Sequence, residues 1–192
     1  MNNLKRCPWC GNDKLYVKYH DEEWGVPLKD DRKLFELLAL ESFQAGLSWI
    51  TILRKRESFR EAFDFFDPEI IVRYNSNKIN ELLINDKIIR NRLKIESVIS
   101  NALLYLRIIG KYSSFSNYIW KFTDGKTIQN NFISISQIPA RTELSDLMSK
   151  EMKKYGFRFF GSTICYAFMQ SAGMVNDHLV NCFRHAQLAN PK

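Results

Sequence analysis

The sequence has little of what irregular or cross-linked proteins depend on. Its 192 residues include only 8 Gly, 5 Pro and 4 Cys. Collagen-like, low-complexity and disulfide-scaffold architectures are therefore excluded. Disorder is excluded as well, because 45% of the residues are hydrophobic and only 26% are charged. A chain of this length can bury a core without covalent cross-links, and we expect a single domain over residues 1–192.

Long apolar runs are also missing. The opening residues Met1–Arg6 contain no apolar stretch typical of a signal peptide. The longest charge-free run, residues 159–176, is interrupted by Gly161, Gln170 and Gly173, which favours a buried helix over a membrane span. We therefore expect a cytoplasmic protein with no membrane contact, whose cysteines are thiols or metal ligands rather than disulfides.

Acidic residues are in the minority. The chain has 28 Lys and Arg against 21 Asp and Glu, a net charge of +7. This balance fits either a polyanionic partner or a solvated basic surface. One segment stands out, because four basic residues and no acid lie within residues 87–94: Lys87, Arg90, Arg92 and Lys94. Two helices joined by a short turn here would direct backbone N–H groups at a phosphate; a solvated helix face is the alternative.

Strand patterns are rare, and helical spacing dominates the chain. Capping signals predict helix starts at Asp30 or Asp31, Asp67–Pro68, Ser76, Lys94, Ser116 and Thr142. Gly110 and Gly156 are predicted to end two of these helices, and residues 123–141 are predicted to form a loop. Only Leu15–Tyr19 and Phe132–Ile135 look strand-like. The sequence therefore predicts an all-α fold.

Potential metal ligands lie near both chain ends. Cys7, Cys10 and His20 lie near one end, and His178 and Cys182 near the other. The i, i+4 spacing of the last two predicts that they share one helix face. Four nitrogen and sulfur ligands from this group would bind zinc and clip the ends together. Two alternatives remain open: Cys7 and Cys10 form a CxxC pair of their own, and Cys182 is a buried apolar residue.

A carboxylate occupies an apolar helical stripe. The steps Leu34, Leu38, Glu41, Ala45 and Trp49 place Glu41 on the same face as its apolar neighbours. Such a group is hydrogen-bonded in a pocket, or it reaches water as an ordinary structural glutamate. Aromatic residues are close to it in sequence: Trp9, Tyr16, Tyr19, Trp24 and Trp49. Flat rings beside a carboxylate suit a planar heterocycle with an amino group, although ordinary core packing is the alternative.

Several long stretches together resemble one family. They are Tyr19–Pro27, Leu40–Thr51, Ile88–Arg92, Tyr155–Phe159, Gly161–Tyr166 and Phe168–His178. These stretches resemble the DNA-3-methyladenine glycosylase I family over residues 7 to about 182. The resemblance implies an all-helical, helix-hairpin-helix type glycosylase. Its hairpin would lie near residues 76–104, and zinc would clip the terminal segments 1–29 and 175–192.

The resemblance also implies roles for individual residues. The zinc ligands fall on Cys7, His20, His178 and Cys182, which makes Cys10 an extra thiol. The base pocket falls on Tyr16, Tyr19, Glu41 and Trp49, with Trp9 and Trp24 nearby. Gly46 and Leu47 correspond to the segment that approaches the DNA gap, with Leu47 as a wedge.

Two departures from the family pattern are expected to matter. Lys87 and Leu93 stand where hairpin glycines are common, so Asn85 or Asp86 is expected to take the left-handed conformation instead. Phe43 stands where polar residues are common and is expected to alter the rim of the site.

The implied reaction is hydrolysis of the N-glycosidic bond of N3-methyladenine in double-stranded DNA by a monomer. The methylated base is cationic and leaves as a neutral molecule, so it needs no protonation. Many helix-hairpin-helix glycosylases have a catalytic aspartate after the hairpin. Here the only acid directly after the hairpin is Glu96, and Asp124 lies in the predicted loop, so no aspartate is well placed to activate water. We therefore expect Glu41 to bind the base, Tyr16 and Trp49 to stack on it, and Tyr19 to hydrogen-bond it. The alternatives are a non-catalytic zinc-containing nucleic-acid-binding protein and a zinc hydrolase.

Overall fold

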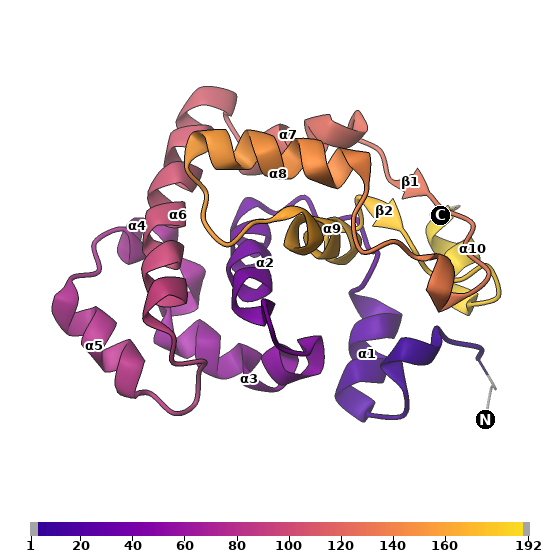
Figure 1. The fold of residues 1–192 in the computed structure, drawn as a ribbon, viewed down its shortest axis with the longest axis horizontal. Coiled ribbons are helices and arrows are strands. Elements are labelled where there is room, and N and C mark those ends of the chain that lie inside the picture. The colour runs from indigo at the N-terminus through magenta and orange to yellow at the C-terminus, as the bar shows by residue number, and fades with distance from the viewer. Residues whose placement is uncertain (1–3, 190–192) are drawn as a thin grey trace.

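The computed structural model describes residues 4–189, and these are mostly helical (Figure 1). The helices are α1 (Lys14–Glu22), α2 (Asp31–Gln44), α3 (Trp49–Ala62), α4 (Pro68–Ile71), α5 (Ser76–Ile84), α6 (Arg92–Tyr112), α7 (Phe115–Trp120), α8 (Glu143–Tyr155), α9 (Ser162–Ser171) and α10 (Phe183–Ala189). Two short strands, β1 (Ile128–Gln129) and β2 (Val175–Asn176), pair in parallel. Short 3-10 turns include η1 (Pro8–Cys10) and η4 (Ile135–Gln137). The predicted all-α class is confirmed.

Helix α2 lies at the centre of the fold, because it packs against α3, α6, α7 and α9. Its Leu34, Phe35 and Leu38 are fully buried, so the helix is enclosed on more than one face. Helix α8 packs closely on α9, and α6 lies alongside α4 and α5. The carboxyl-terminal end of α2 therefore brings Glu41 to a point where several helices meet.

Neighbouring aspartates cap two different helices. The Asp30 side chain accepts a hydrogen bond from the Lys33 backbone N–H, which starts α2. The Asp31 carboxylate accepts from the backbone N–H groups of Phe115 and Ser116 at the start of α7. Each cap satisfies N–H groups that have no partner within their own helix. The pair thus joins two helices that lie more than 80 residues apart in sequence.

The two strand-like segments are not strands. Leu15–Tyr19 lies in α1, because the Asp13 side chain accepts from the N–H groups of Leu15 and Tyr16 and so starts a helix. Phe132–Ile135 lies after β1, in an irregular bend that leads into η4. The predicted loop over residues 123–141 is otherwise irregular and contains only β1 and short 3-10 turns.

The predicted end of α6 at Gly110 is also wrong. The helix continues to Tyr112 and ends at Ser113, whose φ of 65° is left-handed. A glycine inside a helix costs about 1 kcal/mol, which the burial of Tyr105 and Ile108 on the same helix outweighs.

The helix pair α5–α6 is present, but its turn differs from the expectation. Asn85 has a φ of −73°, and Asp86 is not left-handed either. Instead, the Asn85 side chain accepts from the Lys87 backbone N–H at 3.0 Å. Lys55 Nζ on α3 donates to the carbonyls of Asp86 and Lys87 at 3.1 and 3.0 Å. Side-chain hydrogen bonds therefore hold this turn without glycine.

The amino-terminal segment of the described chain contacts the start of α10. The backbone N–H of Phe183, at the start of α10, donates to the carbonyl of Lys5 at 2.9 Å. Within residues 4–189, none of the helices combines the length and hydropathy that crossing a bilayer requires.

Candidate functional site

A cavity of about 270 Å³ opens where α1, α2, α3 and α9 meet. It brings together all six residues predicted for the pocket. Its lining comprises Trp9, Tyr16, Tyr19, Trp24, Glu41, Gln44, Trp49, Ile135, Ile138, Ala167, Gln170 and Ser171. The rings pack on each other: the Trp9 centroid lies 4.9 Å from those of Tyr16 and Trp24, and Tyr19 lies 5.6 Å from Trp49. The aromatic residues thus form walls of a cavity and do not fill it.

Glu41 lies in this cavity with only 1% of its surface exposed. Ser171 Oγ donates to Glu41 Oε1 at 2.9 Å, and the Tyr19 hydroxyl donates to Ser171 Oγ at 2.9 Å. Burial raises the pKa of Glu41 to about 8, and the Ser171 hydrogen bond partly opposes this shift. Burial, together with the charge of Glu41, raises the pKa of Tyr19 well above its usual value. Tyr19 therefore keeps its proton and serves as a donor.

Four buried polar atoms of the lining have no hydrogen-bond partner among the described residues. They are Trp9 Nε1, Glu41 Oε2, Gln44 Oε1 and Trp49 Nε1. Buried polar groups are nearly always paired, because an unpaired one costs about 1–3 kcal/mol. Two donors and two acceptors at one cavity are therefore suited to a ligand that has both kinds of polar group.

Sequence reasoning missed several residues of the lining. Ser171 and Gln170 were visible as polar residues at the end of an otherwise apolar run, a signal that could have been followed. Ile135 and Ile138 come from the irregular segment between β1 and α8, where no periodicity marks them. The expectation for Phe43 is wrong: it is fully buried against Phe59, with ring centroids 4.6 Å apart, and Gln44 lines the cavity instead.

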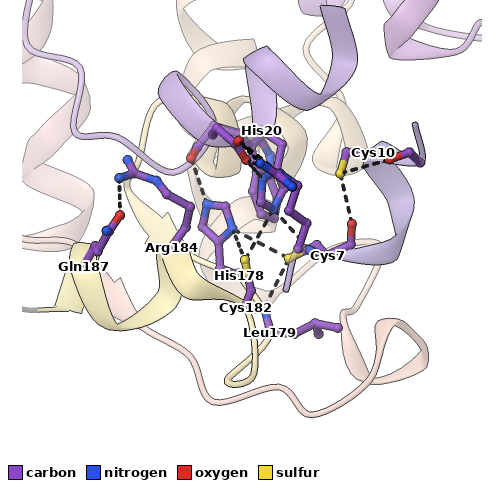
Figure 2. Close-up of polar contacts among 12 residues, drawn as sticks. Cys7, Cys10, His20, His178, Leu179, Cys182, Arg184 and Gln187 are labelled. Carbon is purple, nitrogen blue, oxygen red and sulfur yellow. Dashed lines mark hydrogen bonds and ion pairs between the residues drawn. The ribbon is translucent and has the colours of Figure 1, made fainter. Parts of the chain in front are cut away.

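A second cluster lies beside the pocket, because the Trp9 and Trp24 rings of the lining pack against His20 and His178. Cys7, His20, His178 and Cys182 are buried, and their ligand atoms all lie within 4.8 Å of one another (Figure 2). Cys182 Sγ lies 3.4 Å from His20 Nε2 and 3.5 Å from His178 Nδ1, and Cys7 Sγ lies 3.6 Å from His178 Nδ1. Tetrahedral zinc with bonds of about 2.0–2.3 Å places its ligand atoms about 3.3–3.8 Å apart. The donor set and its spacing fit such an ion.

Hydrogen bonds outside the cluster orient both imidazoles. His178 Nε2 lies 3.0 Å from the carbonyl oxygen of Trp24, which can only accept, so Nε2 carries the proton. His20 Nδ1 likewise lies 2.7 Å from an Asp21 oxygen, and Arg6 pairs with the same carboxylate. Each ring thus turns an unprotonated nitrogen toward the cluster, which is the arrangement of metal-binding histidines.

The His178–Cys182 segment is a turn and not a helix. Leu179 N–H donates to Cys7 Sγ at 3.4 Å, and Val180 N–H donates to the carbonyl of Phe132 at 2.9 Å. Because these N–H groups bond outside the segment, α10 begins only at Phe183. The turn still brings His178 and Cys182 together.

Two further cysteines lie apart from the cluster. The Cys10 sulfur donates to the carbonyl of Cys7 at 3.2 Å and turns away from the other sulfurs (Figure 2). Cys7 and Cys10 are both free thiols, so they form no disulfide. Cys165 is buried in the hydrophobic core.

The residues predicted to contact DNA have different surroundings. Gly46 has a φ of 83° in the turn after α2, and Leu47 beside it is 42% exposed. Lys87, Arg90 and Arg92 are exposed. Lys94 is buried, and its Nζ donates to the carbonyls of Phe43 and Ala45 at 2.9 and 2.6 Å. Lys94 was predicted to contact DNA like the three exposed cations, but it caps the carboxyl-terminal end of α2 instead.

The pocket combines a buried carboxyl group with indole and phenol rings in a helical fold, which suits the class of proteins that enclose a planar base. The comparison with known families agrees with this class. The methyladenine glycosylase family matches residues 9–185, and the chain belongs to this family.

Known relatives cover nearly the whole chain. The DNA-3-methyladenine glycosylase of Haemophilus influenzae is 49% identical over 177 residues, which is 92% of this chain and 96% of the relative. A crystal structure of 3-methyladenine DNA glycosylase I is 49% identical with a TM-score of 0.92, covering 94% of this chain and all of the other. A variant of 3-methyladenine DNA glycosylase I, solved in complex with 3-methyladenine, is 37% identical with a TM-score of 0.90, covering 93% of this chain and 96% of the other.

Proposed function

We propose that this chain is a DNA repair glycosylase that hydrolyses the N-glycosidic bond of N3-methyladenine in alkylated double-stranded DNA. The observation that carries the proposal is the cavity around Glu41, in which ring faces surround four unpaired polar atoms. An extruded base fits this arrangement, because its faces stack and its edges form hydrogen bonds. Family membership and the 3-methyladenine bound to a similar protein support the same substrate. We propose that it acts as a monomer.

Glu41 recognises the positive charge of the methylated base. In the empty pocket its carboxyl is largely protonated at neutral pH, because burial raises its pKa to about 8. A cation nearby favours the ionised form, so a methylated purine gains an attraction that an uncharged purine lacks. The Tyr19–Ser171 hydrogen bonds hold Oε1, which leaves Oε2 free to accept from the amino group of the base. Tyr16 and Trp49 stack on its faces.

The charge of the substrate defines the catalytic requirement. When the bond from C1′ to N9 breaks, the electron pair moves to the base, which leaves as a neutral molecule. Water then adds to C1′ of the sugar and releases a proton to the solvent. The protein therefore needs no general acid for the leaving group, and its contribution is extraction and stabilisation of the positively charged sugar.

The exposed cations and the Gly46–Leu47 turn contact the DNA. Lys87, Arg90 and Arg92 lie on or beside the turn between α5 and α6, where they neutralise phosphates. Leu47 is three residues after Gln44, which lines the pocket, so Leu47 lies near the pocket. The exposed side chain of Leu47 can therefore fill the space that the extruded base leaves in the duplex.

One structural Zn²⁺ is held by Cys7, His20, His178 and Cys182. Four protein ligands leave no open position for water, which disfavours a zinc hydrolase. The ion joins the segment before α1 to the turn before α10. It also fixes two pocket walls, because the Trp9 ring lies 5.3 Å from His20 and the Trp24 ring lies 4.6 Å from His178.

The zinc assignment is tested by metal analysis of matched variants. We expect one zinc per chain in the wild type and in Cys10→Ser, and loss of zinc in Cys182→Ser. Retention of zinc in Cys182→Ser would contradict the ligand set. Chelation that abolished excision without changing thermal stability would contradict a structural role.

The reaction is tested by incubating the protein with methylated duplex DNA and analysing the released bases. We expect free 3-methyladenine and little 7-methylguanine. No release of base, with free 3-methyladenine still quenching tryptophan fluorescence, would instead support the non-catalytic binding protein.

A further inference from the structure

One wall of the pocket is aliphatic and comes from outside the main helices. Ile135 and Ile138, on the segment between β1 and α8, line the same cavity as Glu41. Ile135 is 43% exposed, whereas Ile138 is only partly exposed. Ile135 is therefore the more solvent-exposed residue of this wall, and Ile138 is the more buried one.

Hydrogen bonds fix the position of this segment. The N–H of Ile138 donates to the carbonyl of Ile135 at 3.0 Å, and the Gln137 side chain accepts from the N–H of Ile133 at 2.8 Å. The carbonyl of Phe132 accepts from Val180, which lies in the turn between His178 and Cys182. The segment is thus anchored both within itself and to the cysteine–histidine cluster, so the isoleucines have defined places.

The geometry of a purine relates this wall to the position of the methyl group. The amino group at C6 and the glycosidic nitrogen N9 are on opposite sides of the ring system, and N3 is adjacent to the same carbon as N9. If the amino edge meets Glu41 inside the pocket, the N3-methyl group and the sugar both point toward the opening. Apolar contact is favourable for a methyl group there, because it removes the apolar surface of the methyl group from water.

We propose that Ile138 and Ile135 form an apolar specificity edge for the extruded nucleotide. Ile138 packs against the N3-methyl group of the base, and Ile135 covers the deoxyribose at the opening. The inference rests on the proposed function, since it assumes the same base in the same pocket. It assigns recognition of the methyl group to residues separate from those that recognise the charge and the amino group.

The test of Ile138 compares free bases. 3-Methyladenine and adenine are titrated into wild type, Ile138→Ala and the control Ile133→Ala while tryptophan fluorescence is followed. Ile133 is on the same segment and 64% exposed, but it does not line the cavity. We expect Ile138→Ala to weaken 3-methyladenine binding three- to tenfold, adenine binding less than twofold, and Ile133→Ala to change neither. Equal losses for both bases, or no loss, would overturn the assignment of Ile138.

The test of Ile135 compares excision with free-base binding. We expect Ile135→Ala to lower kcat/KM for release from duplex DNA about tenfold while free 3-methyladenine binds within twofold of wild type. Unchanged excision, or a matching loss of free-base affinity, would overturn its role at the sugar. Ile135→Val should restore most of the activity. Failure of the wild type to release any base would overturn the proposed function and the role of Ile135, but the free-base titration would still decide Ile138.

Discussion

At the Glu41 carboxyl, one oxygen accepts from Ser171 and the other has no partner among residues 4–189. The helical spacing in the sequence predicted this carboxylate on an apolar stripe, and the structure confirms the hydrogen-bonded pocket over the solvated alternative. The partner Ser171 could not be predicted, because it is 130 residues away and reaches Glu41 only through the packing of α9 on α2.

The raised pKa of Glu41 predicts a pH-dependent stability. The unfolded chain loses this proton near pH 4.5, whereas the folded protein keeps it up to about pH 8. Between these values the folded state binds more protons, so its free energy of unfolding falls as pH rises. Glu41→Gln removes this slope. Relative to wild type, we expect the variant to gain a few kcal/mol between pH 5 and pH 8, at about 1.4 kcal/mol per pH unit.

Urea unfolding at pH 5 and pH 8 measures this difference. Glu61→Gln is the control, because Glu61 is exposed. If the free energies of unfolding of Glu41→Gln and wild type differed by the same amount at pH 5 and at pH 8, the prediction of a raised pKa for Glu41 would be contradicted.

Lys94 is predicted to stabilise the fold and not to bind phosphate. Lys94→Ala removes two hydrogen bonds to carbonyls at the end of α2, and we expect a loss of about 1–3 kcal/mol in the free energy of unfolding. The salt dependence of DNA binding should stay unchanged. Lys87→Ala and Arg90→Ala should each lower the slope of log K against log salt by about 1, with little effect on stability. A lower slope for Lys94→Ala would contradict its structural placement.

At the scale of elements, helix starts were the most predictable feature. Thr142 caps α8 and Gly156 ends it, as the sequence indicates, because both signals act within one turn of helix. The turn at residues 178–182 and the end of α6 were predicted wrongly, because long-range hydrogen bonds and core packing decide them. The wall formed by Ile135 and Ile138 has no local signal.

The turn between α9 and β2 depends on one glycine. Gly173 has a φ of +68°, and a Cβ there would overlap the backbone carbonyl carbon of Val26. We expect Gly173→Ala to lower the free energy of unfolding by about 2 kcal/mol or more, because the new Cβ strains the backbone at this position. Gly110→Ala is the matched control, since nothing lies within 4 Å of its Cβ position in α6, and it should stabilise by about 0.5–1 kcal/mol. Thermal unfolding of both variants measures the contrast; similar midpoints would contradict the close approach at Gly173.

Across the whole molecule, the cysteine–histidine cluster and the base pocket share one end of the fold. Trp9 lies between Cys7 and Cys10 in sequence, and Trp24 accepts a hydrogen bond from His178 through its carbonyl, so the cluster positions two walls of the pocket. The resemblance of the motifs predicted the four members of the cluster and six of the residues that line the pocket, but not Gln170, Ser171 or the isoleucines. The proximity of the two sites to each other follows only from the tertiary fold.

The role of Glu41 is tested most directly by the affinities of wild type and Glu41→Gln for free 3-methyladenine and for undamaged duplex DNA. We predict that Glu41→Gln weakens binding of the base at least tenfold and leaves binding of the duplex within twofold, because Glu41 contacts only an extruded base. Unchanged affinity for 3-methyladenine would contradict the central claim that the buried carboxyl of Glu41 recognises the base.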